Sequence, residues 1–220
     1  PVWKTQLRSG IASKETAFAV GDTLGKIHAA TAEDNSLAAR FATDEIFHAI
    51  RIEPYFLRTA QACADVADRL TALANKTATT RHVLVHGDVS PKNILVGGRG
   101  PILLDAECAW YGDPAFDLAF CLNHLLLKCV WNPADTTLYS LCYHALAHAY
   151  MRHVKWESRE ALEGRTAALL PGLLLARIDG ASPVEYITLE EDKKTVRRAA
   201  RQGLKDPPDT LGAFHETFRK

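Results

Sequence analysis

Residues 81–120 decide the fold, and they read RHVLVHGDVSPKNILVGGRGPILLDAECAWYGDPAFDLAF. Residues 83–85 form a short apolar run beside turn-forming residues, which predicts a buried strand. This strand leads into His86-Gly87-Asp88, and Pro91 stiffens the loop that follows. We therefore expect the Asp88 carboxylate to be held in a fixed place at the end of a core strand.

A β-hairpin is predicted next, because the apolar runs 94–96 and 102–104 flank the turn-forming sequence GGRGP. Antiparallel pairing puts the start of the first strand beside the end of the second, so Asn93 and Asp105 become neighbours. Adjacent strands lie about 4.8 Å apart, close enough for two side-chain oxygens to share one hard cation. Asp88 overlooks the same place from the preceding loop. A free carboxylate beside such a cation site indicates phosphoryl transfer from a magnesium-bound nucleotide.

Four spaced elements in this stretch form an ordered set. They are H-G-D at 86–88, Asn93 five positions after the aspartate, D-A-E at 105–107, and G-D-P-A at 112–115 followed by D-L-A at 117–119. Together they resemble the aminoglycoside phosphotransferase and choline kinase superfamily, whose catalytic loop is related to H-R-D-x-x-x-x-N of protein kinases. The resemblance implies an α+β, mostly helical fold. It corresponds to the C-terminal lobe of a protein-kinase-like enzyme, with a small β-hairpin at the catalytic site.

The resemblance also assigns roles to the acidic and amide side chains. It implies that Asp88 is the catalytic base and that Asn93 and Asp105 hold Mg²⁺ with the phosphates of ATP or GTP. Glu107 is a weaker candidate, which the resemblance suggests as a ligand for a second ion. Residues two apart on a strand can point the same way, so Glu107 could lie beside Asp105.

Three further residues are expected to support the site: His86, Ser90 and Asp117. Asp117 lies among apolar residues of a predicted helix, so its carboxylate needs hydrogen-bond donors. The resemblance suggests that these donors are backbone N–H groups near His86. On this interpretation Asp117 braces the catalytic loop and does not touch substrate.

Composition sets broad limits. The chain has 220 residues, of which 47% are apolar and 24% charged, as in an ordinary globular protein. Its 26 basic and 26 acidic residues cancel, so nothing favours nucleic acid or an anionic membrane as a partner. No apolar run approaches 18 residues and no signal-peptide pattern opens the sequence. Five scattered cysteines indicate reduced thiols in a cytoplasmic protein.

Helical periodicity and capping residues predict the remaining elements. We expect helices over residues 13–31, 43–50, 54–73, 113–131, 133–149, 158–178 and 188–202. We expect a connecting segment over 1–10, a polar loop over 75–80, a kink or split at Pro171-Gly172, and an irregular tail over 207–220.

A kinase also needs a second lobe that covers the nucleotide, with a lysine on a strand and a phosphate-covering loop. The helical chain before Val83 does not resemble such a lobe, and GDTLGK at 21–26 fails the P-loop spacing. We therefore expect residues 1–220 to form only the catalytic, acceptor-binding lobe, with residues 1–10 leading from an N-terminal lobe that this sequence lacks. The isolated chain should then be inactive, and its uncovered apolar surface should favour a homodimer.

The spacing of the motifs bears on the acceptor. Eleven residues separate Asp105 from Asp117, too few for a protein-kinase activation loop, and no A-P-E motif follows. A small hydroxylated metabolite is therefore favoured as acceptor over a protein. The helices after Asp117 carry balanced charge, whereas a polycationic aminoglycoside would want an acidic pocket.

Three alternatives stay open. Asp88, Asn93 and Asp105 are residue types that favour turns even where they have no catalytic role. The chain could be a catalytically inactive kinase-like module that binds a nucleotide or a partner. It could also be a helical metal-binding protein, because His144 and His148 are four apart on one predicted helix. A basic stripe over residues 194–205 favours a paired, solvated face over a phosphate site.

Overall fold

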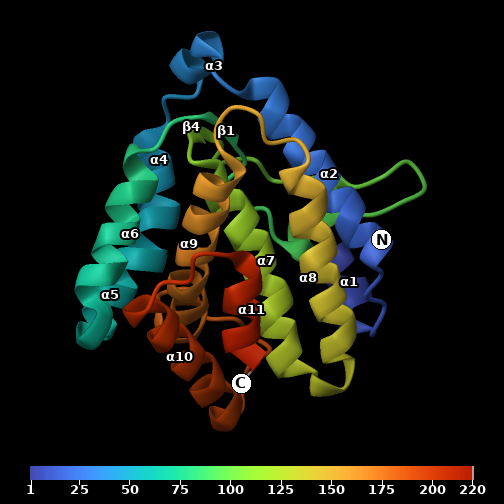
Figure 1. The fold of residues 1–220 in the computed structure, drawn as a ribbon, viewed down its shortest axis with the longest axis vertical. Helices are drawn as coiled ribbons and strands as arrows, with labels where there is room; N and C mark the ends of the chain where they lie inside the picture. The colour runs from blue at the N-terminus through green and yellow to red at the C-terminus, as the bar shows by residue number, and fades with distance from the viewer. Residues whose placement is uncertain (220) are drawn as a thin grey trace.

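Helix α7 (Pro114–Trp131) forms the centre of the fold (Figure 1). Its sequence has almost no polar face, and residues 114–129 are all buried. A helix that is apolar all round must be surrounded by other elements. Helices α8 (Thr136–Met151) and α9 (Arg159–Asp179) pack directly against it. The computed structural model describes residues 1–219.

Helix α2 (Lys14–Thr31) packs along α8, and the two are close neighbours. A Cβ on Gly21 would collide with the backbone carbonyl of Leu146, so the glycine permits this close approach. Ser13 caps α2 by accepting a hydrogen bond from the Thr16 backbone N–H at 3.1 Å, as the sequence predicted.

Two small antiparallel sheets accompany the helices. β1 (Val83–Val85) pairs with β4 (Trp110–Gly112), and β2 (Ile94–Leu95) pairs with β3 (Ile102–Leu103). The second pair is the predicted hairpin, and its loop protrudes from the helices near the N-terminus (Figure 1). Val2 adds an isolated bridge to β2. The prediction of a mostly helical α+β fold with a small hairpin is confirmed.

The remaining elements are helices of 3 to 16 residues. They are α1 (Trp3–Arg8), α3 (Asn35–Arg40), α4 (Asp44–Phe47), η1 (His48–Leu57), α5 (Arg58–Ala62), η2 (Ala64–Val66), α6 (Ala67–Thr79), η3 (Pro91–Asn93), η4 (Pro133–Asp135), α10 (Glu190–Lys205) and α11 (Leu211–Arg219). No helix in the described part of the chain is both long and apolar enough to cross a membrane.

The predicted helix start at Pro54 is wrong. Pro54 lies inside η1, a π-helix that continues from α4 into α5. A proline lacks the N–H that an α-helix needs and clashes with the preceding turn, whereas a wider π-turn accommodates it. The π-helix matters for the site, because Arg51 and Tyr55 project from it into a cavity.

Both terminal segments are more regular than predicted. Residues 1–10 contain α1, which is anchored by the fully buried side chains of Trp3 and Leu7. Within the 207–220 tail, α11 packs through Phe214 and Phe218. In each case, two large apolar residues four apart supply a face that packs on the core.

Three other boundaries also differ. The polar segment 75–80 extends α6 to Thr79. Pro171 lies within α9, which continues unbroken to Asp179. The predicted capping box at Thr188 is not formed, because Leu189 is the N-cap of α10 and makes no side-chain cap hydrogen bond.

Candidate active site

The loop after β1 turns sharply at Gly87, where φ is 82°. A Cβ there would lie 2.7 Å from Cys108 Sγ, so glycine is required for both conformation and space. The turn places the Asp88 side chain against the wall of a cavity, where it is only 7% exposed. The H-G-D sequence therefore has a local structural cause as well as a chemical one.

Asp117, in the first turns of α7, holds this loop in place. Its carboxylate accepts hydrogen bonds from the backbone N–H groups of His86 at 2.7 Å and Gly87 at 2.8 Å. These are the donors that the sequence analysis expected. His28 Nε2 lies 3.2 Å from the same carboxylate, and His28 Nδ1 lies 2.7 Å from the Tyr150 hydroxyl.

The electrostatics of Asp117 fit this bracing position. Complete burial by itself raises the pKa of its carboxyl, but the hydrogen bond and charge of His28, with further support from His86, hold the pKa below its usual value. The carboxylate can therefore stay ionised inside the core and keep its hydrogen bonds to the loop.

Asp88 sits between two cations. Its Oδ2 lies 3.1 Å from Arg51 Nη2 and 3.3 Å from Lys92 Nζ. Arg51 Nε also donates to the Gly87 carbonyl, so one guanidinium fixes both the backbone and the carboxylate. The sequence analysis missed Arg51, and the one available signal was a lone arginine inside the apolar run HAIRIEPYFL.

The hairpin pairing brings the backbone of Asn93 beside that of Leu104, the residue before Asp105. The Leu104 N–H donates to the Asn93 carbonyl at 2.8 Å, so Asp105 follows the residue that faces Asn93. Asn93 Nδ2 donates to the Asp88 carbonyl at 3.3 Å, which leaves its side-chain oxygen available. Asp105 is exposed and has a φ of 68°, a left-handed conformation that costs a non-glycine residue about 1 kcal/mol or more.

The predicted geometry for Glu107 is wrong. Residues 105–107 are not in a strand: β3 ends at Leu103, and Glu107 lies in an exposed turn before β4. The argument that residues two apart on a strand share a face therefore does not apply. Glu107 stays a candidate on the resemblance alone.

The donor set fits magnesium better than a transition metal. Mg²⁺ takes oxygen ligands, keeps several waters and needs one or two protein groups besides substrate phosphates. Asn93 and Asp105 supply two such oxygens. Among the described residues, no cluster of three or more His, Cys, Asp or Glu side chains could hold a metal on its own.

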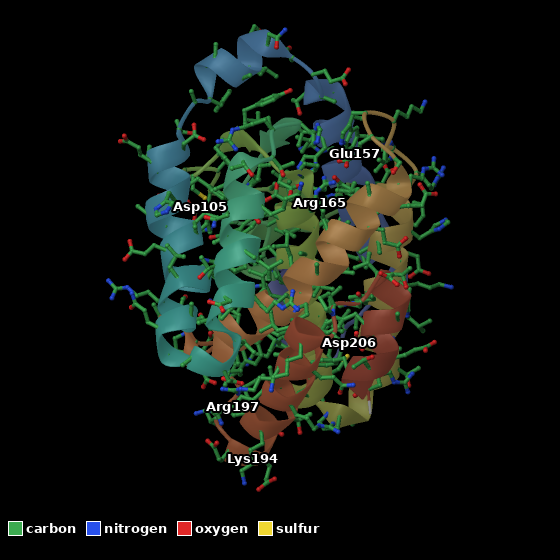
Figure 2. All side chains as sticks on the ribbon, turned by 60° about the vertical axis from the view of Figure 1, so that its left-hand side comes forward. Asp105, Glu157, Arg165, Lys194, Arg197 and Asp206 are labelled. Carbon is green, nitrogen blue, oxygen red and sulfur yellow. The ribbon has the colours of Figure 1, made fainter. Side chains whose placement is uncertain are left out.

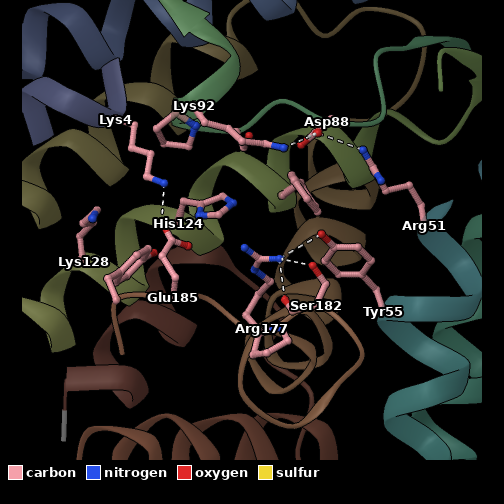
Figure 3. A pocket seen from close by; sticks show the side chains of 15 residues that line it. Lys4, Arg51, Tyr55, Asp88, Lys92, His124, Lys128, Arg177, Ser182 and Glu185 are labelled. Atoms are coloured by element: carbon pink, nitrogen blue, oxygen red, sulfur yellow. Dashed lines mark hydrogen bonds and ion pairs between the residues drawn. The ribbon is translucent and has the colours of Figure 1, made fainter. Parts of the chain in front are cut away.

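A cavity of about 330 Å³ opens beside Asp88 (Figure 3). That volume suits a small-molecule ligand. Its walls come from α1, η1, the catalytic loop, α7, the end of α9 and the segment after α9. The lining includes Lys4, Arg51, Tyr55, Asp88, Ser90, Lys92, Phe120, His124, Lys128, Arg177, Ser182, Glu185 and Tyr186.

Two ionisable side chains of α7 that line this cavity have lowered pKa values. Burial, together with the nearby charges of Arg177 and Lys128, lowers the pKa of His124 well below its usual value, so this ring is neutral. Burial also lowers the pKa of Lys128 to about 8. Sequence analysis placed these residues only on an apolar helix and assigned them no role.

Ser90 and His86, expected as supporting residues, both lie at this loop. Ser90 lines the cavity, and its buried Oγ has no hydrogen-bond partner within residues 1–219. His86 Nδ1 accepts from the Asp88 N–H at 3.2 Å. The histidine therefore stabilises the turn that carries Asp88.

The structure does not support the two alternative ligand sites, the histidine metal site and the phosphate-binding basic stripe. The His144 ring lies 4.6 Å from that of His215, but neither belongs to a metal-binding group in the described chain. In the basic stripe, Arg197 binds Asp179 with Nε at 3.0 Å, and Arg201 Nε lies 3.1 Å from Asp65. The stripe is thus partly paired, as the sequence favoured.

Comparison with known proteins identifies a family and a similar fold. The model of the phosphotransferase enzyme family, APH, matches residues 7–162, which include the catalytic loop, the hairpin and α7. A search of curated proteins finds no significant match.

The fold is also similar to a solved structure, the amicoumacin kinase hAmiN in complex with AMP-PNP, Ca²⁺ and Ami. The two are 17% identical with a TM-score of 0.52, and the similarity covers 93% of this chain and 63% of the other. The chain thus spans less than two thirds of that kinase. Because the family match covers most of the sequence and includes Asp88, Asn93, Asp105 and Asp117, this chain belongs to the phosphotransferase enzyme family.

Proposed function

We propose that this chain is the catalytic, acceptor-binding part of a small-molecule kinase. The observation that carries the proposal is the position of Asp88, whose carboxylate lines the cavity on one side while its backbone carbonyl binds Asn93 on the other. A base is thereby placed between a space for an acceptor and a pair of hard oxygen ligands. The amicoumacin kinase of similar fold was solved with a nucleotide analogue and Ca²⁺, which supports a nucleotide and a divalent cation as ligands here.

In the proposed reaction, the acceptor hydroxyl lies in the cavity within hydrogen-bond distance of Asp88. Its oxygen attacks the terminal phosphorus of ATP or GTP, the bond to the leaving diphosphate breaks, and Asp88 takes the hydroxyl proton. Arg51 and Lys92 orient the carboxylate so that the proton has a fixed acceptor. Correct placement matters more than strong basicity when the transition state is loose.

Asn93 and Asp105 would hold Mg²⁺, with Glu107 as a weaker candidate for a second ion. When bound, the ion would supply positive charge that neutralises the nucleotide phosphates. The left-handed backbone of Asp105 supports this role, because such strain is often retained at functional sites.

We propose further that a nucleotide-covering lobe completes the site, since the part of the chain described here forms no strand-rich lobe above the catalytic loop. Ile102 and Leu104 of the hairpin are 56% and 39% exposed, and they offer apolar surface for such a lobe or for a second copy. All five cysteines are free, which supports a cytoplasmic setting.

The test is a phosphate-transfer assay with ATP and GTP over a panel of hydroxylated acceptors. It should be run on residues 1–220 and on the chain with its N-terminal lobe restored. We expect transfer only by the two-lobed form, and we expect Asp88→Asn to lower its turnover by about 100-fold or more without loss of folding. Near-normal turnover by Asp88→Asn would remove this residue from the role. Nucleotide binding without transfer to any acceptor would favour the inactive-module alternative.

A further inference from the structure

The cavity beside Asp88 carries more positive charge than its own carboxylates balance. Its lining holds five cationic side chains and two anionic ones: Lys4, Arg51, Lys92, Lys128 and Arg177, with Asp88 and Glu185. Arg51 and Lys92 both pair with Asp88. Lys4 pairs with Glu185. The carboxylates are therefore used up by three of the five cations.

Lys128 and Arg177 are the two that remain. Neither has a carboxylate partner within ion-pair distance among residues 1–219. Arg177 Nη1 donates to Ser182 and Tyr55. The Lys128 side chain is 3% exposed, and its ammonium lies 3.8 Å from the ring centroid of Tyr186. A buried cation without a counter-ion is unfavourable, so its place in a ligand-sized cavity calls for an anion from outside the chain.

The same wall is short of hydrogen-bond acceptors. Arg177 Nε and Tyr186 Oη are enclosed there and have no hydrogen-bond partner within the described chain. Buried donors are nearly always satisfied in native proteins, so unsatisfied ones that line a common cavity suggest a missing ligand. An oxyanion supplies the acceptor atoms that this wall lacks.

Lys128, Arg177 and Tyr186 form what we call the second wall of the cavity, and it lies across the cavity from Asp88. Figure 3 shows Asp88 and Lys92 on one side of the cavity, with Lys128, Arg177 and Glu185 on the other. A volume of about 330 Å³ leaves room for a small molecule between them. A ligand could therefore be held at one end by charge and present its other end to Asp88.

We propose that the acceptor carries an oxyanion, either a carboxylate or a phosphate ester, which binds between Lys128 and Arg177 while a hydroxyl of the same molecule lies at Asp88. This inference rests on the proposed function for the identity of the reacting end. It assigns the acceptor to hydroxylated acids or sugar phosphates and disfavours amines, which the two cations would repel.

The phosphates of the nucleotide are the competing source of negative charge. Titrations should therefore be done on the two-lobed protein, saturated with magnesium and a non-hydrolysable ATP analogue. The nucleotide site is then already filled. The probes are glucose, gluconate, glucose 6-phosphate, glucosamine and inorganic phosphate. They share size or charge but differ in the group that meets the second wall.

We expect gluconate or glucose 6-phosphate to bind at least about tenfold more tightly than glucose, and glucosamine to bind more weakly than glucose. The affinities of gluconate and glucose 6-phosphate, compared with each other, show whether the site prefers a carboxylate or a phosphate ester. Equal or tighter binding of glucose or glucosamine would overturn the inference. Failure of every anionic probe to bind, inorganic phosphate included, would overturn it as well.

Lys128→Met is the matched variant, because it removes the charge and keeps the apolar stem. It should weaken binding of the anionic probes about tenfold or more and leave binding of glucose unchanged. Lys194→Met is the control: it changes net charge equally, but its side chain is 63% exposed and lies at the foot of the molecule (Figure 2). An equal loss of affinity in both variants would contradict a specific anion site.

The transfer assay separates this inference from the proposed function. Transfer to neutral acceptors in preference to anionic ones would leave the kinase function standing and overturn the oxyanion site. Tight anion binding lost in Lys128→Met, with no transfer to any acceptor, would keep the anion site and overturn the kinase function.

Discussion

Replacing Lys128 by methionine should make the folded protein more stable. Lys128 is almost fully enclosed beside Trp131 and Tyr186, and burial lowers the pKa of its amine from 10.5 to about 8. At about 1.4 kcal/mol per unit of pKa, this corresponds to a cost of about 3 kcal/mol for keeping the charge inside the fold. Water in the adjoining cavity screens part of that cost, so we expect about 1–2 kcal/mol of stabilisation at pH 7. Methionine also makes favourable sulfur–aromatic contacts in such surroundings.

The gain should depend on pH in a defined direction. Below about pH 8 the folded and unfolded states both carry the Lys128 charge, and the full burial cost is present. Between about pH 8 and 10.5 the folded state loses this proton while the unfolded state keeps it, so the wild type regains stability relative to the variant. The groups that shape this titration are Lys4 and Arg8 on α1, which lower the pKa, and Glu185, which raises it.

Urea unfolding at pH 7 and pH 9.5 measures this difference, and a thermal shift of about 2–8 °C should accompany it at pH 7. Lys194→Met should change the free energy of unfolding by less than about 0.5 kcal/mol, because its charge is already solvated. The reasoning fails if Lys128→Met is less stable than the wild type at pH 7. It also fails if the stability difference stays the same at both pH values.

Three other outcomes follow from the site and its scaffold. Asp105→Ala should abolish magnesium-dependent nucleotide binding in calorimetry and Glu107→Ala should weaken it less, whereas undiminished affinity in both would reject the assignment. Asp117→Asn should lower the free energy of unfolding by about 2–3 kcal/mol, and the wild-type advantage should disappear as pH falls through the lowered pKa of Asp117. Arg165→Met should cost about 3–5 kcal/mol, since it leaves the 1%-exposed side chain of Asp113 without its cation, and a loss below about 0.5 kcal/mol would show that this pair is not structural.

The sequence predicted those strands and helices that depend on residues close together in the chain. The apolar run 83–85, the glycine-rich turn at 97–101 and the Asp113-Pro114 helix start all act over a few residues, and the structure has β1, the hairpin and α7 in those places. The need of Asp117 for hydrogen-bond donors was predictable from its place in an apolar helix, and the family resemblance pointed to the backbone near His86. The backbone of the loop that carries Asp88 is thus largely determined within residues 81–120, although Arg51 and His28 support it from elsewhere in the chain.

The cavity walls could not be predicted in this way, because they come from distant parts of the chain. Arg51 lies on a π-helix that periodicity does not reveal, and Arg177 lies at the end of α9. Lys128 appeared as one charge in a run of apolar residues. The packing of both α7 and η1 against α9 brings these cations to one cavity. The prediction that Glu107 shares a strand face with Asp105 was also wrong, because a turn replaces the strand there.

Net charge is a poor guide to what such a cavity binds. The chain is neutral overall, and counting charges along the helices after Asp117 gave no excess of either sign. In the structure, however, many of those charges are paired at a distance from the cavity: Arg165 binds Asp113 and Glu157, and Arg197 binds Asp179. The charges that face the cavity are a different set, in which Lys128 and Arg177 lack carboxylate partners among residues 1–219. Because electrostatic interactions strengthen when water is excluded, the buried Lys128 and the half-buried Arg177 outweigh many solvated pairs in selecting a ligand. The same burial that costs stability at Lys128 therefore gives the cavity its preference for an anion.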